Sequence, residues 1–245
     1  MAITDFTHKN RRYRRVTVDP IRAFTVGVDL GKSVDSTVIA ILDYSLMGKG
    51  EFREEEGSQF TILHEKYTEQ FDLRELRRIK LETSYDQIVD HVVCLMNTRP
   101  LEDAELVIDD SGVGRPIGDM LEAQTSLRPV RVTTTAGEQA IKVSQRRWHV
   151  PKAELVSTLS GLFSTNRIRL AHDLPNLEVL RRECQAFLRN WTGSGRATFS
   201  ASGSNHDDTI SALSLACWWA SMKNSPAWSR RRGGDFYQGW VKGMN

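Results

Sequence analysis

Residues 24–30 read Phe24-Thr25-Val26-Gly27-Val28-Asp29-Leu30, an apolar and partly β-branched run that stops at Gly31. A short run of this kind, bounded by a turn residue, predicts a buried β-strand. Residues 37–43 form a second such run after a six-residue turn, so the two stretches predict a hairpin. Asp29 places a charge inside the first strand, which is costly unless the carboxylate is paired or binds a cation.

After this hairpin the pattern changes to alternating strands and helices. Further strands are predicted at residues 60–67, 105–109, 129–133, 167–170 and 197–200. Helices are predicted to begin after residue 84 and at residue 151, to include residues 120 and 121, and to cover residues 177–188 and 207–222. Strands followed by strand–helix alternation predict an α/β protein with a mixed central β-sheet flanked by helices. No linker divides residues 23–222, so we expect one domain, with a basic arm at 1–22 and a basic tail at 223–245.

The composition is that of a globular protein, with 40% hydrophobic and 26% charged residues. The three cysteines, Cys94, Cys184 and Cys217, are widely spaced, which argues against a disulfide framework or a thiolate zinc site. This cysteine usage fits a reducing compartment. No apolar run is long enough to span a bilayer, and the N-terminus has no apolar core of a secretory signal. We therefore expect a soluble intracellular protein.

Charge is unevenly distributed along a chain whose net charge is only +2. Residues 1–22 hold six basic and two acidic side chains. Residues 128–152 hold six basic side chains and one acidic one, and residues 223–245 hold five basic side chains and one acidic one. Separated basic segments can form a surface that follows phosphates, although three solvated surface segments are an equally good interpretation. Residues 146–148, Arg-Arg-Trp, form a basic–aromatic cluster that could hold a phosphate backbone, and a plain solvated loop is an equally good interpretation.

Acidic residues recur where a strand ends or a helix begins. These positions are Asp29, the pair Asp109 and Asp110, and the pair Asp207 and Asp208. Neighbouring strands lie about 4.8 Å apart, so carboxylates on them can share divalent cations, which prefer oxygen ligands. Each position alone also fits a structural role as a turn, cap or first-turn residue. Together they predict a site for one or two divalent ions.

Residues 27–33 are similar to a phosphate-binding P-loop, Gly-x-x-x-x-Gly-Lys-Ser, but we reject this interpretation for two reasons. The chain has three residues between its two glycines where four are required, and the first glycine falls inside the predicted strand. The histidines are scattered and do not form a zinc-binding pair. His206 directly precedes Asp207, where a surface position at a helix start is favoured over a role in proton transfer.

Taken together, four segments resemble the nuclease domain of phage terminase large subunits, a branch of the ribonuclease H-like superfamily. They are residues 26–31 with 35–38, residues 107–121 with Asp-x-Ser-Gly-Val-Gly, residues 150–155 with 166–170, and residues 206–216, which open with His-Asp-Asp. The resemblance covers about residues 24–222. It matches Asp109 rather than Asp110 to a metal ligand, and it leaves open whether Asp207 or Asp208 is the principal one.

The resemblance implies a ribonuclease H-like fold and an endonuclease that cuts concatemeric double-stranded viral DNA at the start and end of capsid filling. Two Mg²⁺ or Mn²⁺ ions would be held by Asp29, Asp109, Asp207 and Asp208. Such an ion pair activates a water and stabilises the leaving oxygen of a phosphodiester. Implied partners are a packaging ATPase domain or subunit, the small terminase and the portal, in the host cytoplasm and without a membrane.

Contacts with the DNA backbone carry no sequence code, so we expect cleavage with little sequence preference and strong salt sensitivity. The candidates for these contacts are Lys142, Arg146, Arg147 and Lys152. Full-length terminases also carry an N-terminal packaging ATPase, for which the residues before 24 leave no room. The chain is therefore expected to be an excised nuclease domain or a protein whose motor is encoded elsewhere.

Three alternatives remain. A resolvase- or transposase-type nuclease would share the same chemistry. An actin-like or sugar-kinase-type ATP-binding domain is disfavoured, because neither a second domain nor a second Asp-Gly phosphate hairpin is present in the sequence. A non-catalytic DNA-binding or packaging module with a decayed site is disfavoured because the carboxylate set is intact.

Overall fold

The computed structural model describes residues 2–31, 36–192 and 207–224, with side chains other than those of residues 186–192. Contacts divide these residues into two compact units. One, called here the strand unit, contains residues 2–23, 44–70 and Asn224. The other, called the α/β unit, contains residues 24–43, 71–192 and 207–223. Strands β3, β4 and β5 contribute residues to both units.

The sheet of the α/β unit has the strand order β5-β4-β3-β6-β7-β9-β8. Strands β3, β6, β7 and β9 are parallel neighbours, β8 is antiparallel to β9, and β10 pairs in parallel with β5. The bounds are β3 Ile21–Asp29, β4 Val38–Glu56, β5 Thr61–Arg78, β6 Glu105–Asp109, β7 Val130–Thr135, β8 Ile141–Lys142, β9 Arg147–Pro151 and β10 Ile168–Leu170.

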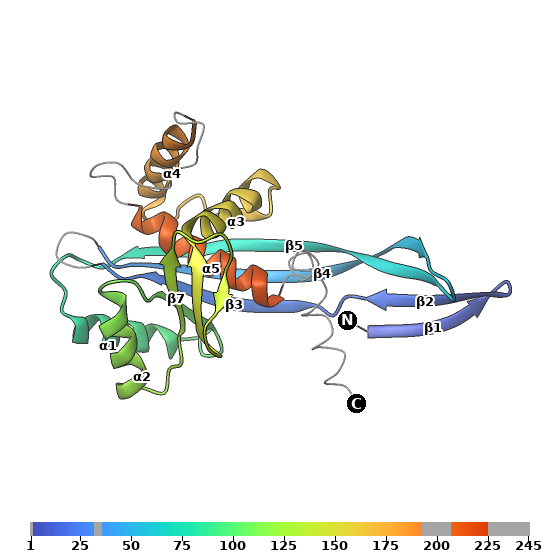
Figure 1. Cartoon of the computed structure of the whole chain (residues 1–245), viewed down its shortest axis with the longest axis horizontal. Coiled ribbons are helices and arrows are strands. Elements are labelled where there is room, and N and C mark those ends of the chain that lie inside the picture. The colour runs from blue at the N-terminus through green and yellow to red at the C-terminus, as the bar shows by residue number, and fades with distance from the viewer. Residues whose placement is uncertain (1, 32–35, 193–206, 225–245) are drawn as a thin grey trace. The chain divides into compact units, whose positions relative to one another are not determined.

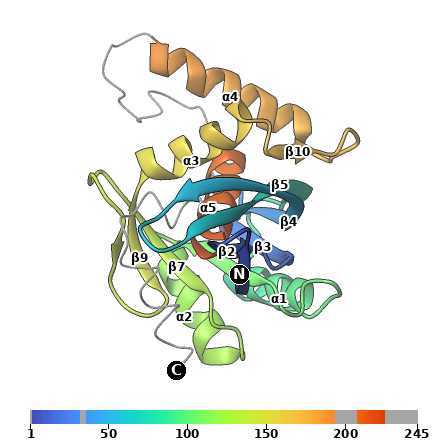
Figure 2. The same ribbon diagram turned by 90° about the vertical axis from the view of Figure 1, so that its right-hand side faces the viewer.

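Helices cover both faces of this sheet (Figures 1 and 2). The helices are α1 Tyr85–Met96, α2 Gly114–Gln124, α3 Lys152–Ser164, α4 Leu177–Thr192 and α5 Asp208–Asn224. Val26 and Val28 of β3 pack into a buried cluster with the apolar faces of α1 and α2. Gly27 of the same strand points the other way, against α5. The α/β class with a mixed central sheet flanked by helices is confirmed.

The strand unit contains a hairpin that the sequence did not predict. Strands β1 (Ala2–His8) and β2 (Arg11–Thr17) are antiparallel, and β2 pairs in parallel with the first residues of β5 (Figure 1). The predicted basic arm at residues 1–22 is thus largely extended strand. Residues 44–70, predicted to belong to the domain at 23–222, cluster with this hairpin. Of the predicted tail, 225–245 lies outside the described residues, as does the predicted strand at 197–200.

Most element boundaries lie close to the predictions, with two clear exceptions. The Ser84–Gln87 capping box is present, with both reciprocal bonds formed at the start of α1. Strands β4 and β5 are 19 and 18 residues long, far beyond the predicted 37–43 and 60–67, because they continue through exposed charged positions. Of the basic–aromatic cluster at 146–148, Arg147 and Trp148 belong to β9 and Arg146 directly precedes it, so the solvated-loop alternative does not describe these residues. Across the residues that the structure describes, no helix combines the length and apolarity needed to cross a membrane.

Candidate active site

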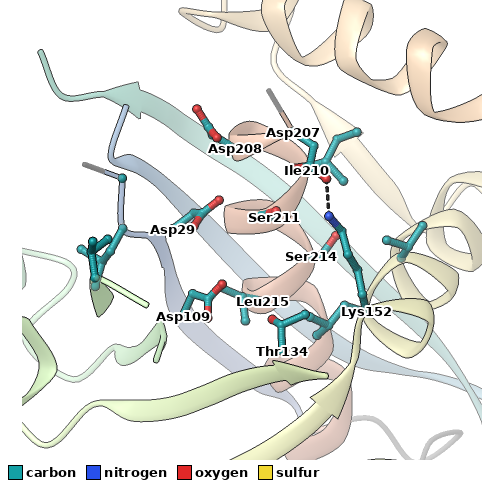
Figure 3. A pocket seen from close by; sticks show the side chains of 15 residues that line it. Asp29, Asp109, Thr134, Lys152, Asp207, Asp208, Ile210, Ser211, Ser214 and Leu215 are labelled. Atoms are coloured by element: carbon teal, nitrogen blue, oxygen red, sulfur yellow. Dashed lines mark hydrogen bonds and ion pairs between the residues drawn. The ribbon is translucent and has the colours of Figure 1, made fainter. Parts of the chain in front are cut away.

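One pocket of the α/β unit gathers the acidic side chains singled out in the sequence (Figure 3). Its volume is about 320 Å³. It is lined by Asp29 at the end of β3, Asp109 at the end of β6, Asp207 and Asp208 at the start of α5, and Lys152 at the start of α3. The structure thus brings all four proposed ligands to one place, together with one of the four basic candidates.

The positions of Asp29 and Asp109 follow from strand register. Strands β3 and β6 are parallel with Val28 opposite Ile108, so the next residue on each strand is an aspartate at the same edge of the sheet. Val28 and Ile108 are buried in the α1–α2 cluster. Side chains alternate along a strand, so both aspartates point to the other face, towards α5.

The start of α5 lies near these aspartates because β3 and α5 approach very closely. A Cβ on Gly27 would lie 2.9 Å from the backbone nitrogen of Ala216 and 3.0 Å from its Cβ, and closer still to the carbonyl oxygen of Ala212. Only a glycine on the strand, facing alanines on the helix, permits this approach. Gly27 therefore lies inside the strand as a packing residue, in agreement with the rejection of a P-loop.

Asp109 and Asp110 have different surroundings. Oδ1 of Asp109 accepts a 2.8 Å hydrogen bond from the backbone nitrogen of Ser111, and the carboxylate lines the pocket. Asp110 is buried and accepts a 2.7 Å bond from Nε of Arg131. Asp110 is thus occupied by a structural ion pair, and Asp109 is the one available to a ligand in the pocket.

Arg131 was counted in the sequence only as one charge of a basic segment. Its side chain is 0% exposed and contacts Asp110, Asp119 at 2.6 Å and Glu122 at 3.2 Å. It also donates to the carbonyl oxygen of Arg115 at 3.0 Å. The paired carboxylates raise the pKa of Arg131 although burial opposes this. Arg131 therefore ties α2 to the turn after β6 and fixes the backbone that carries Asp109.

The two aspartates at the start of α5 face different cations. Nζ of Lys152 donates a 2.5 Å hydrogen bond to Oδ2 of Asp207 (Figure 3). Oδ2 of Asp208 lies 3.7 Å from a terminal nitrogen of Arg78, and the Asp208 side chain is 10% exposed against 24% for Asp207. Both line the pocket, so the geometry does not single out one of them as the principal ligand.

Glu183 of α4 lies outside the pocket lining but supports the helix start that carries Asp207 and Asp208, a role that the sequence reasoning missed. Its Oε2 accepts from the backbone nitrogens of Thr209 and Ile210 at 3.0 and 3.2 Å, and from the Thr209 hydroxyl at 2.5 Å. Burial raises the pKa of Glu183 against the effect of these bonds. The carboxylate satisfies backbone donors that the first turn of α5 leaves without intrahelical partners. No spacing signal marked it, because it is one of several charged residues along α4.

Negative charge accumulates in the pocket. Burial and the neighbouring carboxylates of Asp109, Asp208 and Asp207 raise the pKa of Asp29 well above its ordinary value, and Lys152 opposes them only in part. Burial also raises the pKa of Asp109, although its bonds to Ser111 lower it. Buried like charges of this kind are stabilised by a cation placed among them.

The donor chemistry fits a hard divalent ion, since every acidic group lining the pocket offers carboxylate oxygens. Their present side-chain positions are not yet those of ligands: across the described parts of the chain, no three His, Cys, Asp or Glu side chains are close enough to hold one ion. Binding an ion here would require the carboxylates to turn towards one another.

Of the four candidates for DNA contact, Lys142, Arg146 and Arg147 lie on or beside the β8–β9 hairpin, and Lys152 begins α3. Lys142 is exposed on β8, with its Nζ 5.7 Å from the ring centre of Trp148. Arg146 donates to Glu105 at 2.6 Å and Arg147 to Glu122 at 3.4 Å, while Lys152 lies in the pocket. Trp148 is buried edge-on against Trp218, so it is a core residue. His206 lies outside the described residues.

No protein-family model and no curated protein sequence matches the chain. Among solved structures it is similar to the large terminase nuclease from thermophilic phage G20c, at 23% identity over 80% of this chain and 81% of that one, with a TM-score of 0.47. A second structure, of that nuclease with bound magnesium, gives 22% identity, 82% and 83% coverage, and a TM-score of 0.47. The chain is thus similar to solved structures of the kind of protein that its four sequence segments resemble.

Proposed function

We propose that this chain is a metal-dependent endonuclease that hydrolyses phosphodiester bonds in double-stranded DNA. The observation that carries the proposal is the meeting of carboxylates from the ends of two parallel strands and the start of one helix in an open pocket. Asp29, Asp109 and the Asp207–Asp208 pair are the proposed ligands of Mg²⁺ or Mn²⁺. When bound, a pair of such ions supplies an activated water and neutralises charge on the phosphate and the leaving oxygen.

The residues in and around the pocket favour the binding of a cation there. Asp29 retains a proton over a wider pH range than an exposed aspartate, because it is buried among other carboxylates. A divalent ion would displace that proton, so ion binding and deprotonation of Asp29 are coupled. Glu183 fixes the first turn of α5, and Arg131 fixes the turn that carries Asp109. These contacts fix the backbone that carries the proposed ligands.

Lys152 contributes positive charge to a pocket that receives a polyanion. Its bond to Asp207 holds that carboxylate near α3. If Asp207 served as a metal ligand, the Lys152 ammonium group would be available to a phosphate oxygen. Lys152 is therefore proposed as a phosphate contact inside the site. Lys142, Arg146 and Arg147 remain proposed contacts outside it.

The proposed biological setting is that of a viral packaging terminase, with concatemeric DNA as the substrate. The packaging ATPase, the small terminase and the portal are its proposed partners. Translocation of DNA is not assigned to these residues. Strand joining, or a preference for branched junctions among the products, would favour the transposase or resolvase alternatives.

Plasmid cleavage tests the proposal. The protein is incubated with supercoiled plasmid in Mg²⁺, Mn²⁺ or EDTA, alongside Asp29→Asn and Asp109→Asn variants. Asp103→Asn is the matched control, because Asp103 is exposed and does not line the pocket. The expected result is metal-dependent nicking and linearisation that both site variants lose and the control keeps. Cleavage that survives both site substitutions, or no cleavage under any metal and salt condition, would overturn the proposal.

A further inference from the structure

The β1–β2 hairpin of the strand unit presents arginine side chains on a rigid strand pair. β2 reads Arg11-Arg12-Tyr13-Arg14-Arg15-Val16-Thr17. Lys9 and Asn10 form its two-residue turn with φ of 47° and 63°, the left-handed backbone of a tight hairpin turn. The pairing of β2 with β5 holds the hairpin on its other side. The arginines are therefore carried on ordered strand rather than on a flexible arm.

Three of the hairpin's four arginines, Arg12, Arg14 and Arg15, place their guanidinium groups over aromatic rings. Arg12 lies 4.4 Å from the ring centre of Phe60, and Arg15 lies 5.2 Å from Phe6 and 5.0 Å from Phe52. Phe6 is itself stacked on Tyr13 across the hairpin at 5.2 Å. A guanidinium stacked on a ring keeps its N–H edges free to donate in the ring plane.

Only one of these arginines is neutralised by a carboxylate. Arg14 donates two 2.8 Å bonds to Asp5. Within the described part of the chain, no carboxylate lies within ion-pair distance of Arg11, Arg12 or Arg15, and these three side chains are exposed. The hairpin therefore carries three arginines without a direct carboxylate contact, in a unit whose described residues hold nine Lys or Arg and eight Asp or Glu side chains.

Three acidic residues on the neighbouring strands are engaged elsewhere. Glu51 pairs with Lys66, and Glu55 pairs with Arg53 and His64. Glu65 accepts from the backbone nitrogens of Val18 and Gly50. These three carboxylates are therefore bonded to groups other than the β2 arginines, while Glu54 and Glu56 of β4 are exposed in the same unit.

We infer that the β1–β2 hairpin is a binding surface for the phosphate backbone of duplex DNA. Arg11 and Arg15 lie on the same face of β2, about 13 Å apart by strand rise. Duplex DNA carries one negative charge per roughly 1.7 Å of its axis, so a strand laid along it meets several phosphates. Exposed guanidiniums on this face without carboxylate partners, one of them (Arg15) also held over aromatic rings, match such an array of charge. The choice of duplex DNA as the ligand of the hairpin rests on the proposed function, in which duplex DNA is the substrate.

The test measures how DNA binding depends on salt. Binding of the full chain to a fluorescent 30-base-pair duplex is followed by anisotropy in EDTA, so that no cleavage occurs, over a series of KCl concentrations. The variant Arg11→Gln/Arg15→Gln should weaken binding and reduce the slope of log K against log salt by about 1.8, because two phosphates are no longer neutralised. Lys49→Gln/Arg53→Gln removes the same charge from exposed positions of β4 and should leave the slope unchanged.

A conservative variant separates loss of charge from loss of fold. Arg11→Lys/Arg15→Lys retains both charges and should keep most of the salt slope. An unchanged slope in the double Gln variant, or an equal loss in the β4 control, would overturn the inference, and an acidic protein segment would then be the better occupant. Plasmid cleavage by the native chain reports on the proposed function separately. A reduced salt slope in the double Gln variant without plasmid cleavage by the native chain would contradict only the proposed endonuclease activity. Plasmid cleavage with an unchanged salt slope in that variant would contradict only the proposed role of the hairpin.

Discussion

Replacing Gly27 with alanine tests the close approach of β3 and α5. The new Cβ would lie 2.9 Å from the backbone nitrogen of Ala216, where ordinary van der Waals contact begins at 3.4 Å, and nearer still to the carbonyl oxygen of Ala212. These are backbone atoms, so α5 must move away from β3 by about half an ångström or more. Overpacking of this kind costs roughly 2 kcal/mol, which lowers the melting temperature by about 4–8 °C in a chain of this size.

The same movement separates Asp29 from Asp207 and Asp208. Misplacing a catalytic group by about 1 Å typically costs about 100-fold in rate, so cleavage should fall by up to that factor at saturating metal. Gly161→Ala in α3 is the matched control, because a Cβ there meets no atom within 4 Å. It should stabilise the protein slightly, by roughly 0.5–1 kcal/mol, and leave cleavage unchanged. Native melting and native cleavage in Gly27→Ala would refute the packing argument.

Three further predictions follow from the contacts around the pocket. Glu183→Ala removes the acceptor for the first turn of α5, so the free energy of unfolding measured in urea should fall by about 1–3 kcal/mol; an unchanged midpoint would contradict the role of Glu183. Arg131→Met leaves the buried carboxylate of Asp110 unpaired and should lower the free energy of unfolding by roughly 3–5 kcal/mol. Adding Asp110→Asn should restore much of that free energy, and additive losses in the double variant would contradict the pairing. Because the pKa of Asp29 is raised in the folded state, its contribution to stability in EDTA is fully present below the ordinary aspartate pKa and is lost as pH rises through the raised value. The Asp29→Asn variant should not lose this stability as the pH rises, so at pH 7 in EDTA its melting temperature should be higher than that of the native chain. The same dependence of melting temperature on pH in both proteins would contradict the placement of Asp29 among carboxylates.

The sequence predicted the core strands well because each is a short apolar run between turn residues. Strands β3 and β6 also carry their aspartates at the same end, and parallel pairing then places Asp29 beside Asp109. Such a pattern depends only on neighbours along the chain and on the two-residue period of a strand. It is therefore visible without a structure.

Features that depend on tertiary contacts were not visible. Glu183 and Arg131 look like ordinary charged residues in sequence, and only the fold brings them to Thr209 and Asp110. The long extensions of β4 and β5 were missed because exposed charged residues do not signal a strand. In the structure those positions are stabilised by cross-strand pairs such as Glu51 with Lys66.

The basic segments were predicted as charge without partners, and the structure divides them. In the segment at 128–152, Arg131, Arg146 and Arg147 are all bonded to carboxylates of the α/β unit. In the same segment Arg128 is exposed and donates only to carbonyl oxygens, and on β2 the exposed Arg11, Arg12 and Arg15 have no carboxylate within ion-pair distance among the described residues. Counting charges along a chain therefore does not show which of them remain available to a polyanion.

The central claim is that the pocket carboxylates bind a divalent ion. Anomalous diffraction from a crystal grown with Mn²⁺ tests this most directly, because it locates manganese independently of activity. The account predicts anomalous density in the pocket, with Asp29, Asp109 and at least one of Asp207 and Asp208 turned towards it. Density absent from the pocket at saturating Mn²⁺, with Lys152 still bonded to Asp207, would contradict it.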